Sequence, residues 1–142
     1  MHTGFTIATH GPGLYEFTRE VAHWVAEGVA GPGLDEAVLS LFVRHTSASL
    51  VIQENADPDV CADLEAYFAR LVPPASDPSM RYLTHVLEGP DDMPAHIKAA
   101  LLPVSLTIPV IDGRLALGTW QGIYLFEHRL APHRREVVAL LR

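Results

Sequence analysis

Short stretches of the chain alternate between apolar and polar residues, which is the pattern of strands that bury one face. Phe5 and Ile7 alternate with polar neighbours, and Asp112-Gly113 supplies the residues that a tight hairpin turn favours. These patterns predict a mainly antiparallel sheet. The predicted strands cover residues 3–8, 37–44, 50–52, 104–110, 114–118, 119–128 and 134–141.

Three further segments are predicted to be helices. Residues 14–26 and 58–71 place apolar side chains three and four positions apart, as the buried stripe of a helix requires. Asp57-Pro58 marks a helix start, because Asp caps free backbone N–H groups and Pro fits the first turn. A shorter helix is predicted over residues 91–102. The apolar face predicted for the second helix consists of Val60, Leu64, Tyr67, Phe68 and Leu71.

The order of these elements predicts one α+β domain over residues 1–142. Helices lie in the first two-thirds of the chain and hairpin-linked strands follow, which favours a mainly antiparallel sheet with helices packed against it. Gly31-Pro32-Gly33 predicts a loop. Residues 75–90 form a second loop that is longer than packing requires, and long ordered loops often carry function.

Composition narrows the classes of function. The chain has 142 residues and a formal net charge of −7, which argues against a nucleic-acid partner held through phosphates. The single cysteine, Cys61, excludes an internal disulfide framework and a zinc site made of several thiolates. The sequence shows neither a membrane-spanning segment nor a secretory leader, so we expect a cytoplasmic protein without a membrane partner.

Histidines are the first candidates for chemistry. The chain has eight, and His45, His85 and His96 fall at a predicted strand end, in the long loop and in the helix after it. If the fold brings them together, three neutral imidazoles suit Zn²⁺ or a similar ion with one position left open. The alternative is that each is separately a surface or hydrogen-bonded core histidine.

Other polar residues leave two interpretations open. Asp57 and Asp92 stand near predicted helix starts, where a structural cap and a catalytic or metal-binding role are both compatible with the sequence. Residues 118–122 read Gly-Thr-Trp-Gln-Gly, and glycine within a strand indicates close approach by a backbone or ligand. In one interpretation, Thr119 and Gln121 bind a ligand. In the other, the segment is an ordinary β-bulge with Trp120 in the core.

Four motifs in order resemble the YjbQ family over residues 3–141. They are His-Thr-Ser-Ala-Ser at 45–49, Glu-Asn-Ala-Asp-Pro at 54–58, Glu-Gly-Pro-Asp-Asp-Met-Pro-Ala-His-Ile-Lys at 88–98 and Gly-Thr-Trp-Gln-Gly at 118–122. The resemblance implies a small cytoplasmic α+β protein that forms homotrimers. It also implies the activity in the family's name, secondary thiamine-phosphate synthase.

The resemblance also assigns residues. It places His45, His85 and His96 in the family's histidine positions. It implies a catalytic set of His45, His85, Asp57 and Lys98. The sequence departs from many members after Glu127, where His128-Arg129 replaces an acidic residue and a Gly-Pro turn. The polar cluster and closing strand that the resemblance implies comprise Asn55, Asp57, Asp63, Thr119, Gln121 and Glu127.

Three functions follow as expectations. A thiamine-phosphate synthase joins a pyrimidine pyrophosphate to a thiazole phosphate and releases pyrophosphate. Mg²⁺ on Asp57, Asp91 or Asp92 would assist it, with Lys98 and Arg129 meeting phosphate. Asn55, Thr119, Gln121, Glu127 and Arg129 would bind the substrate, with His85 as general acid. The alternatives are a metal-dependent hydrolase with a three-histidine site, and a non-enzymatic trimer that binds a small phosphorylated metabolite.

Overall fold

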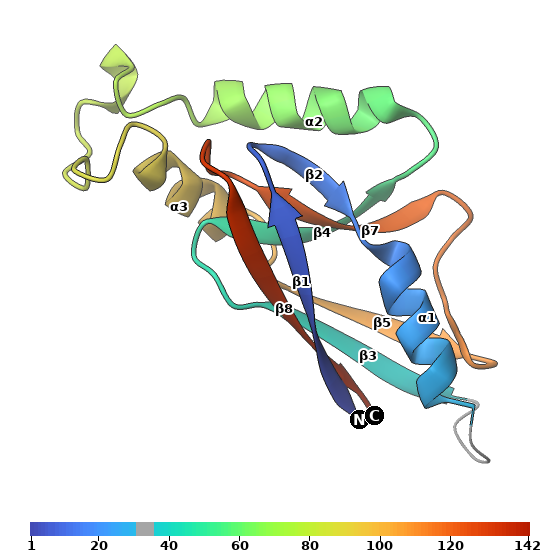
Figure 1. The fold of residues 1–142 in the computed structure, drawn as a ribbon. Helices are drawn as coiled ribbons and strands as arrows, with labels where there is room; N and C mark the ends of the chain where they lie inside the picture. The colour runs from blue at the N-terminus through green and yellow to red at the C-terminus, as the bar shows by residue number, and fades with distance from the viewer. Residues whose placement is uncertain (31–35) are drawn as a thin grey trace.

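The computed structural model describes residues 1–30 and 36–142, and its strands form two antiparallel sheets (Figure 1). The five-stranded sheet has the order β1-β8-β3-β5-β6, and the three-stranded sheet has the order β2-β7-β4. The predicted turn at Gly31-Pro32-Gly33 lies outside the described residues. The strands are β1 (His2–Thr9), β2 (Gly13–Glu16), β3 (Glu36–Val43), β4 (Ala48–Glu54), β5 (Ser105–Ile111), β6 (Arg114–Leu115), β7 (Gln121–Glu127) and β8 (His133–Leu141).

Three α-helices accompany the sheets: α1 (Thr18–Gly28), α2 (Pro58–Leu71) and α3 (Asp92–Leu101). A short 3₁₀ turn, η1 (Pro78–Met80), lies in the long loop between α2 and α3. The predicted single-domain α+β fold with antiparallel sheets is confirmed. Among the described residues, none of the helices combines the length and apolar character needed to cross a membrane.

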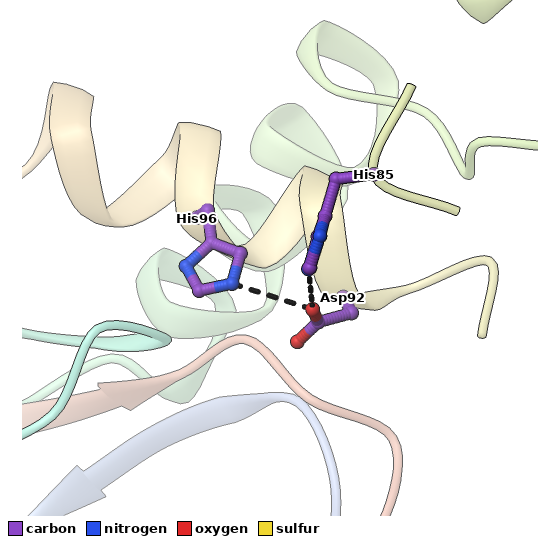
Figure 2. Close-up of side chains that lie close together, drawn as sticks. All are labelled: His85, Asp92 and His96. Atoms are coloured by element: carbon purple, nitrogen blue, oxygen red, sulfur yellow. Dashed lines mark hydrogen bonds and ion pairs between the residues drawn. The ribbon is translucent and has the colours of Figure 1, made fainter. Parts of the chain in front are cut away.

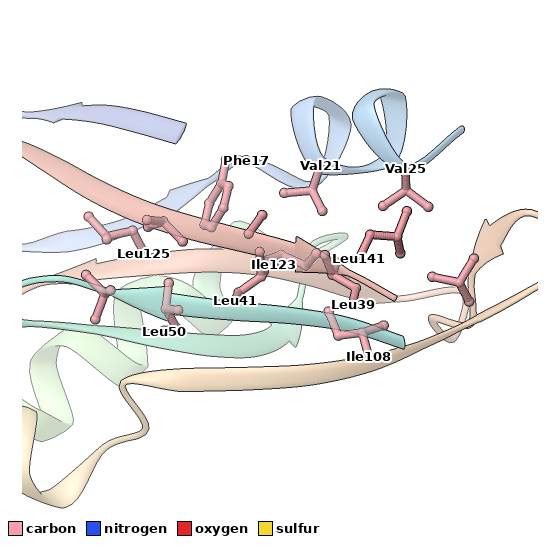
Figure 3. Close-up of a cluster of buried hydrophobic side chains, with 14 of the residues drawn as sticks. Phe17, Val21, Val25, Leu39, Leu41, Leu50, Ile108, Ile123, Leu125 and Leu141 are labelled. Atoms are coloured by element: carbon pink, nitrogen blue, oxygen red, sulfur yellow. The ribbon is translucent and has the colours of Figure 1, made fainter. Parts of the chain in front are cut away.

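The main core lies between α1 and the two sheets (Figure 3). Val21 and Val25 of α1 are fully buried, and they pack with inward-facing residues of β3 and β7. In β3 every second residue is buried, so the alternation seen in the sequence corresponds to a half-buried strand. The other buried side chains that Figure 3 labels are Phe17, Leu39, Leu41, Leu50, Ile108, Ile123, Leu125 and Leu141.

Two sequence-based predictions about the helices need correction. The helix predicted over residues 14–26 begins only at Thr18, because Gly13–Glu16 pairs as strand β2 with β7. A long-range ladder thus overrides local helical periodicity. Helix α2 has the predicted bounds, but its apolar face remains partly open: Tyr67 is 60% exposed and Leu71 52%.

Strand β7 is buried on both faces and ends at a buried charge. The Glu127 carboxylate is fully buried, and it accepts hydrogen bonds from Arg135 Nε at 2.8 Å and from Thr9 Oγ1 at 2.5 Å. Burial alone would raise the pKa of Glu127, but the bonds from Arg135 and Thr9 outweigh it and hold the pKa below its usual range. Arg135 also reaches Ser47 Oγ at 2.9 Å. The ion pair between Arg135 and Glu127 connects β8 to the end of β7.

We therefore expect Arg135→Ala to destabilise the protein by about 3 to 5 kcal/mol, because it leaves the Glu127 carboxylate buried without its partner. Arg134→Ala is the matched control, since this neighbour is exposed and should change the free energy of unfolding by no more than about 0.5 kcal/mol. Urea unfolding followed by circular dichroism measures both. Equal stability of the two variants would contradict this account.

Candidate metal site

The long loop and α3 together position a group of histidines and carboxylates. The loop is ordered by its own contacts: Asp77 caps η1 through the backbone N–H of Ser79, and Ala75 N–H donates to Pro90 O at 2.8 Å. Its later part carries His85 back toward the start of α3 (Figure 2). The long loop is therefore ordered, and it places His85 beside α3.

His85, Asp92 and His96 converge on one point (Figure 2). Asp92 and His96 are four residues apart on α3, so they share one face of the helix. Asp92 Oδ2 lies 2.7 Å from His85 Nε2 and 3.3 Å from His96 Nε2. One ligand atom from each of the three residues lies within 4.8 Å of the others.

The hydrogen bond made by His96 Nδ1 determines whether Nε2 of the neutral ring carries a proton or a lone pair. His96 Nδ1 lies 3.0 Å from Thr46 O, and a carbonyl oxygen only accepts, so Nδ1 carries a proton. In the neutral ring, Nε2 then has a lone pair. That lone pair faces the carboxylate of Asp92. Two electron-rich atoms in this position require a cation between them, either a proton or a metal ion.

Asp92 is held in place by Arg129. The Arg129 guanidinium donates to Asp92 Oδ1 at 2.5 Å and to Asp91 Oδ2 at 2.9 Å. A third bond, from Nη2 to Glu88 O at 3.3 Å, fastens the loop that carries His85. Because Arg129 uses Oδ1, the other oxygen of Asp92 is left for the histidines.

Hydrogen bonds and neighbouring charges shift the pKa values of His85 and Asp92. The hydrogen bond with Asp92 raises the pKa of His85 above its ordinary value. Burial alone would raise the pKa of Asp92, but its hydrogen bond with His85 and the charge of Arg129 together lower it. Asp92 therefore remains a carboxylate, which is the form that binds metal.

The donor set suits a transition metal better than Mg²⁺. Two imidazole nitrogens and one carboxylate oxygen are the ligands of many catalytic zinc sites and non-haem iron sites, whereas Mg²⁺ prefers oxygen and water. The contact from His96 to Thr46 O fixes the ring orientation, as a supporting bond does in known metal sites. The side chain of Asp92 is 4% exposed and that of His85 48%, so the group opens to solvent on the His85 side.

The predicted three-histidine set does not assemble in this structure. Across residues 1–30 and 36–142, the only histidines in such a group are His85 and His96. His45 Nε2 instead accepts a hydrogen bond from the backbone N–H of Glu136 at 2.9 Å. Burial, together with the charge of Arg135, lowers the pKa of His45. The physical reason is that the chain after β3 turns this ring toward β8, while the next residue, Thr46, contacts His96.

The predicted substrate-binding residues lie at opposite ends of the β4–β7 strand pair. Gln121 starts β7 opposite the end of β4, next to Asn55, whereas Glu127 lies at the other end of the same pairing. Six residue steps of about 3.3 Å separate these ends by roughly 20 Å. Asn55 Nδ2 donates to Glu16 Oε2, and Gln121 Oε1 accepts from Gly118 N–H. Thr119 is exposed nearby.

Residues 118–122 settle one alternative left by the sequence. Trp120 is 61% exposed, so the expected core position for this side chain is wrong. The close approach expected at a glycine is present: a Cβ added to Gly122 would lie 2.6 Å from Glu16 Oε2. A larger residue here would displace the Glu16 carboxylate.

Four other predicted residues lie outside the His85 group. Asp57 caps α2 by accepting from Asp59 N–H at 2.9 Å, as one of its two interpretations proposed. Asp63 is exposed on the same helix. Glu127 is enclosed in its contacts with Arg135. Lys98 lies on α3 and lines a separate cavity.

Two features were not identified from the sequence. The sequence leaves Asp92 either a cap or a catalytic or metal-binding residue and does not group it with His96, although the four-residue interval between them on a helix predicts a shared face. His128 was noted only as a departure from a family pattern, yet it is buried at 3% exposure. Its position shortly after the continuous apolar run of residues 123–126 was the available signal.

A small α+β domain whose long loop and third helix gather two imidazoles around a buried carboxylate is the class of protein that this fold and site define. A family model described as UPF0047 protein YjbQ-like matches residues 3–142, and the chain belongs to this family. The resemblance predicted from four sequence motifs is thereby confirmed.

Relatives extend over nearly the whole chain. A UPF0047 protein of Synechocystis sp. is 52% identical over 93% of this chain and 84% of its own length. The YjbQ protein of Escherichia coli O157:H7 is 40% identical over 96% of this chain and 94% of its own. A crystal structure of a YjbQ/UPF0047 protein from Clostridium acetobutylicum superposes with a TM-score of 0.83 at 32% identity, covering 99% of both chains. These relatives define the family and fold, and the function has to be argued from the site.

The contact between His85 and Asp92 leads to a pH-dependent prediction. In the metal-free protein we expect His85 to titrate above its ordinary value of about 6.5, and Asp92→Asn to bring that pKa down. Because folding raises the pKa, the charged pair stabilises the protein fully below roughly pH 6.5 and loses its effect as the pH rises through the folded-state value. Histidine NMR titration tests this. An unchanged His85 titration in Asp92→Asn would contradict it.

Proposed function

We propose that His85, Asp92 and His96 bind a divalent transition-metal ion, with Zn²⁺ as the representative, and that the protein hydrolyses a small phosphorylated metabolite in the cytoplasm. The observation that supports it most is the approach of His96 Nε2 to within 3.3 Å of Asp92 Oδ2, with His96 Nδ1 bonded to the Thr46 carbonyl. When the His96 ring is neutral, a bound cation would remove the repulsion between these two atoms. When bound, such an ion supplies Lewis-acid polarisation of a phosphoryl oxygen and lowers the pKa of water.

The chain's own groups account for the remaining requirements of hydrolysis. Arg129 holds Asp92, and the Thr46 carbonyl orients His96, so the donor atoms are preorganised. Glu88 Oε2 lies 2.9 Å from His85 Nε2, and its side chain is 65% exposed. From there the Glu88 carboxylate is placed to accept a proton from an attacking water.

Thiamine-phosphate synthesis, which the resemblance implies, receives less support from this geometry. That reaction needs cationic groups for two phosphorylated substrates and oxygen ligands for Mg²⁺. Arg129, expected to meet phosphate, is engaged with Asp91 and Asp92. Lys98 lines a separate cavity that excludes His85 and His96. Hydrolysis at a nitrogen-rich metal site therefore fits the described residues better.

We also propose that the chain forms the homotrimer that the resemblance implies. The outer face of the five-stranded sheet carries exposed apolar residues on neighbouring strands, where Val38 pairs with Pro109 and Ser40 pairs with Leu140. Phe42 and Ile111 on this face are 51% and 52% exposed. Exposed apolar side chains that recur along one sheet face, with Phe42 and Ile111 near its opposite ends, are typical of a surface that a partner covers.

Zinc titration distinguishes the proposed ligands from the three-histidine set. We expect His85→Ala and His96→Ala each to weaken Zn²⁺ binding by more than about a hundredfold, because each removes a ligand. His45→Ala should leave the affinity close to that of the unchanged protein, since its Nε2 is bonded to Glu136. Isothermal titration calorimetry measures all three. Loss of binding in His45→Ala would restore the three-histidine site.

Hydrolysis can be separated from metal binding at Glu88. With Zn²⁺ bound, we expect Glu88→Gln to lower the kcat for a phosphate monoester by about a hundredfold or more, as loss of a general base does, while Zn²⁺ affinity is retained. His23→Ala is the control, because this histidine is exposed on α1. If zinc-loaded protein releases pyrophosphate and forms thiamine phosphate but cleaves no ester, the synthase replaces the hydrolase.

Sedimentation equilibrium tests the trimer. We expect a species of three times the chain mass of 15.5 kDa, and Phe42→Glu should dissociate it because a charge would be buried in the interface. Tyr67→Glu, at an equally exposed aromatic residue on α2, should not. A monomer at micromolar concentration would refute the proposal.

A further inference from the structure

A cavity of about 210 Å³ lies between α2, α3 and the end of β7, apart from the His85 group. Its walls are largely apolar, with Phe68 and Val72 from the α2 side, Pro94 from α3 and Phe126 from β7. The rings of Phe68 and Phe126 meet edge to face at 5.7 Å. Lys98 and His128 also line the cavity, together with the acidic residues Glu65, Asp91 and Glu127.

His128, which lines this cavity, has a buried ring nitrogen without a hydrogen-bond partner among the described residues. The residue is 3% exposed, and its Nε2 lies 2.9 Å from the hydroxyl of Ser49, which is fully buried. A buried hydroxyl needs an acceptor for its proton, so Ser49 donates to Nε2 and the ring proton sits on Nδ1. Nδ1 is buried, and it has no hydrogen-bond partner among residues 1–30 and 36–142. Burial lowers the pKa of His128 to about 3, so the ring stays neutral.

Lys98 supplies a second free donor. In the part of the chain that the structure describes, its ammonium has no carboxylate within 4.0 Å. The nearby Asp91 carboxylate is already occupied by Arg129 and by the backbone N–H of Leu130. Burial lowers the pKa of Lys98, and the charges of Glu65 and Asp91 oppose that effect. The cavity thus presents two donors, one of them cationic.

We propose that this cavity binds a small organic carboxylate with a compact apolar body. A carboxylate accepts from both the Lys98 ammonium and the His128 Nδ1–H, while its apolar body contacts Phe68 and Phe126. A neutral alcohol would leave the ammonium unpaired, and a free phosphate would leave the aromatic walls unused. The volume is below the roughly 300–1,000 Å³ of sites for drug-sized ligands, so it suits a ligand smaller than a nucleotide.

This site differs from the metal group in both residues and chemistry. Helix α3 carries Asp92 and His96 to the metal group, whereas Pro94 and Lys98 line the cavity. Asp91 borders the cavity, but its carboxylate is held by Arg129. Carboxylate binding at Lys98 therefore requires no metal, and it can be measured with a chelator present.

Phenylacetate is a suitable probe, with 2-phenylethanol as its uncharged counterpart. In calorimetry with a chelator, we expect phenylacetate to bind the unchanged protein at least tenfold more tightly than 2-phenylethanol or inorganic phosphate. Lys98→Met keeps the length and apolar stem of the side chain, and it should weaken phenylacetate binding by tenfold or more. Arg70→Met, at an exposed position on α2, should leave it unchanged.

An NMR measurement on the unchanged protein makes the test independent of folding in any variant. With ¹⁵N-labelled histidine, we expect His128 to carry its proton on Nδ1 and this resonance to move when phenylacetate is added. Three results would overturn the proposal: equal binding of phenylacetate and 2-phenylethanol, equal binding by the Lys98→Met variant, or a static His128 resonance at saturating phenylacetate. Equal binding of phosphate would show that the apolar walls contribute nothing, which also refutes it.

Discussion

The buried carboxylate of Glu127 is the constraint on which the arrangement of both candidate sites depends. Besides its ion pair with Arg135, it accepts the backbone N–H groups of His128 at 3.1 Å and Arg129 at 3.2 Å. These bonds fix the turn of the chain directly after β7. As a result, His128 is directed to the cavity beside α2, and Arg129 reaches the two aspartates at the start of α3. Three consecutive residues thus connect the core, the cavity and the metal group.

Much of the fold was predictable because its signals are local. Asp57-Pro58 gave the start of α2 at the correct residue, and Asp112-Gly113 gave the hairpin, with both residues at positive φ. The errors occurred where the local structure depends on residues that are distant in the sequence. Residues 14–16 have helical periodicity, but they form an antiparallel strand pairing with β7 instead. No local pattern could reveal that pairing, because its partner lies more than a hundred positions away in the chain.

The candidate site was only partly predictable, for a related reason. The choice of His85 and His96 followed from a long loop and a helix beside it, and the structure brings them together. Asp92 replaces His45 in the group, because ring direction depends on which backbone N–H a histidine meets. For His45 that group belongs to Glu136, at the far end of the chain. The role of Lys98 similarly depends on which side of α3 its side chain takes, which spacing alone did not resolve.

The order of strands in the larger sheet also has a consequence for how the chain acquires its structure. Strand β8 follows every other strand in the sequence, yet it lies between β1 and β3 and pairs with both. During synthesis, β1 therefore waits without a neighbour in its own sheet until β8 has left the ribosome. Pairings of such large sequence separation are slow to form, and the waiting strands expose unpaired edges. The sheet is completed only once β8 has docked, so the interval between the synthesis of β1 and that docking is when a nascent chain is most exposed to aggregation and to chaperones.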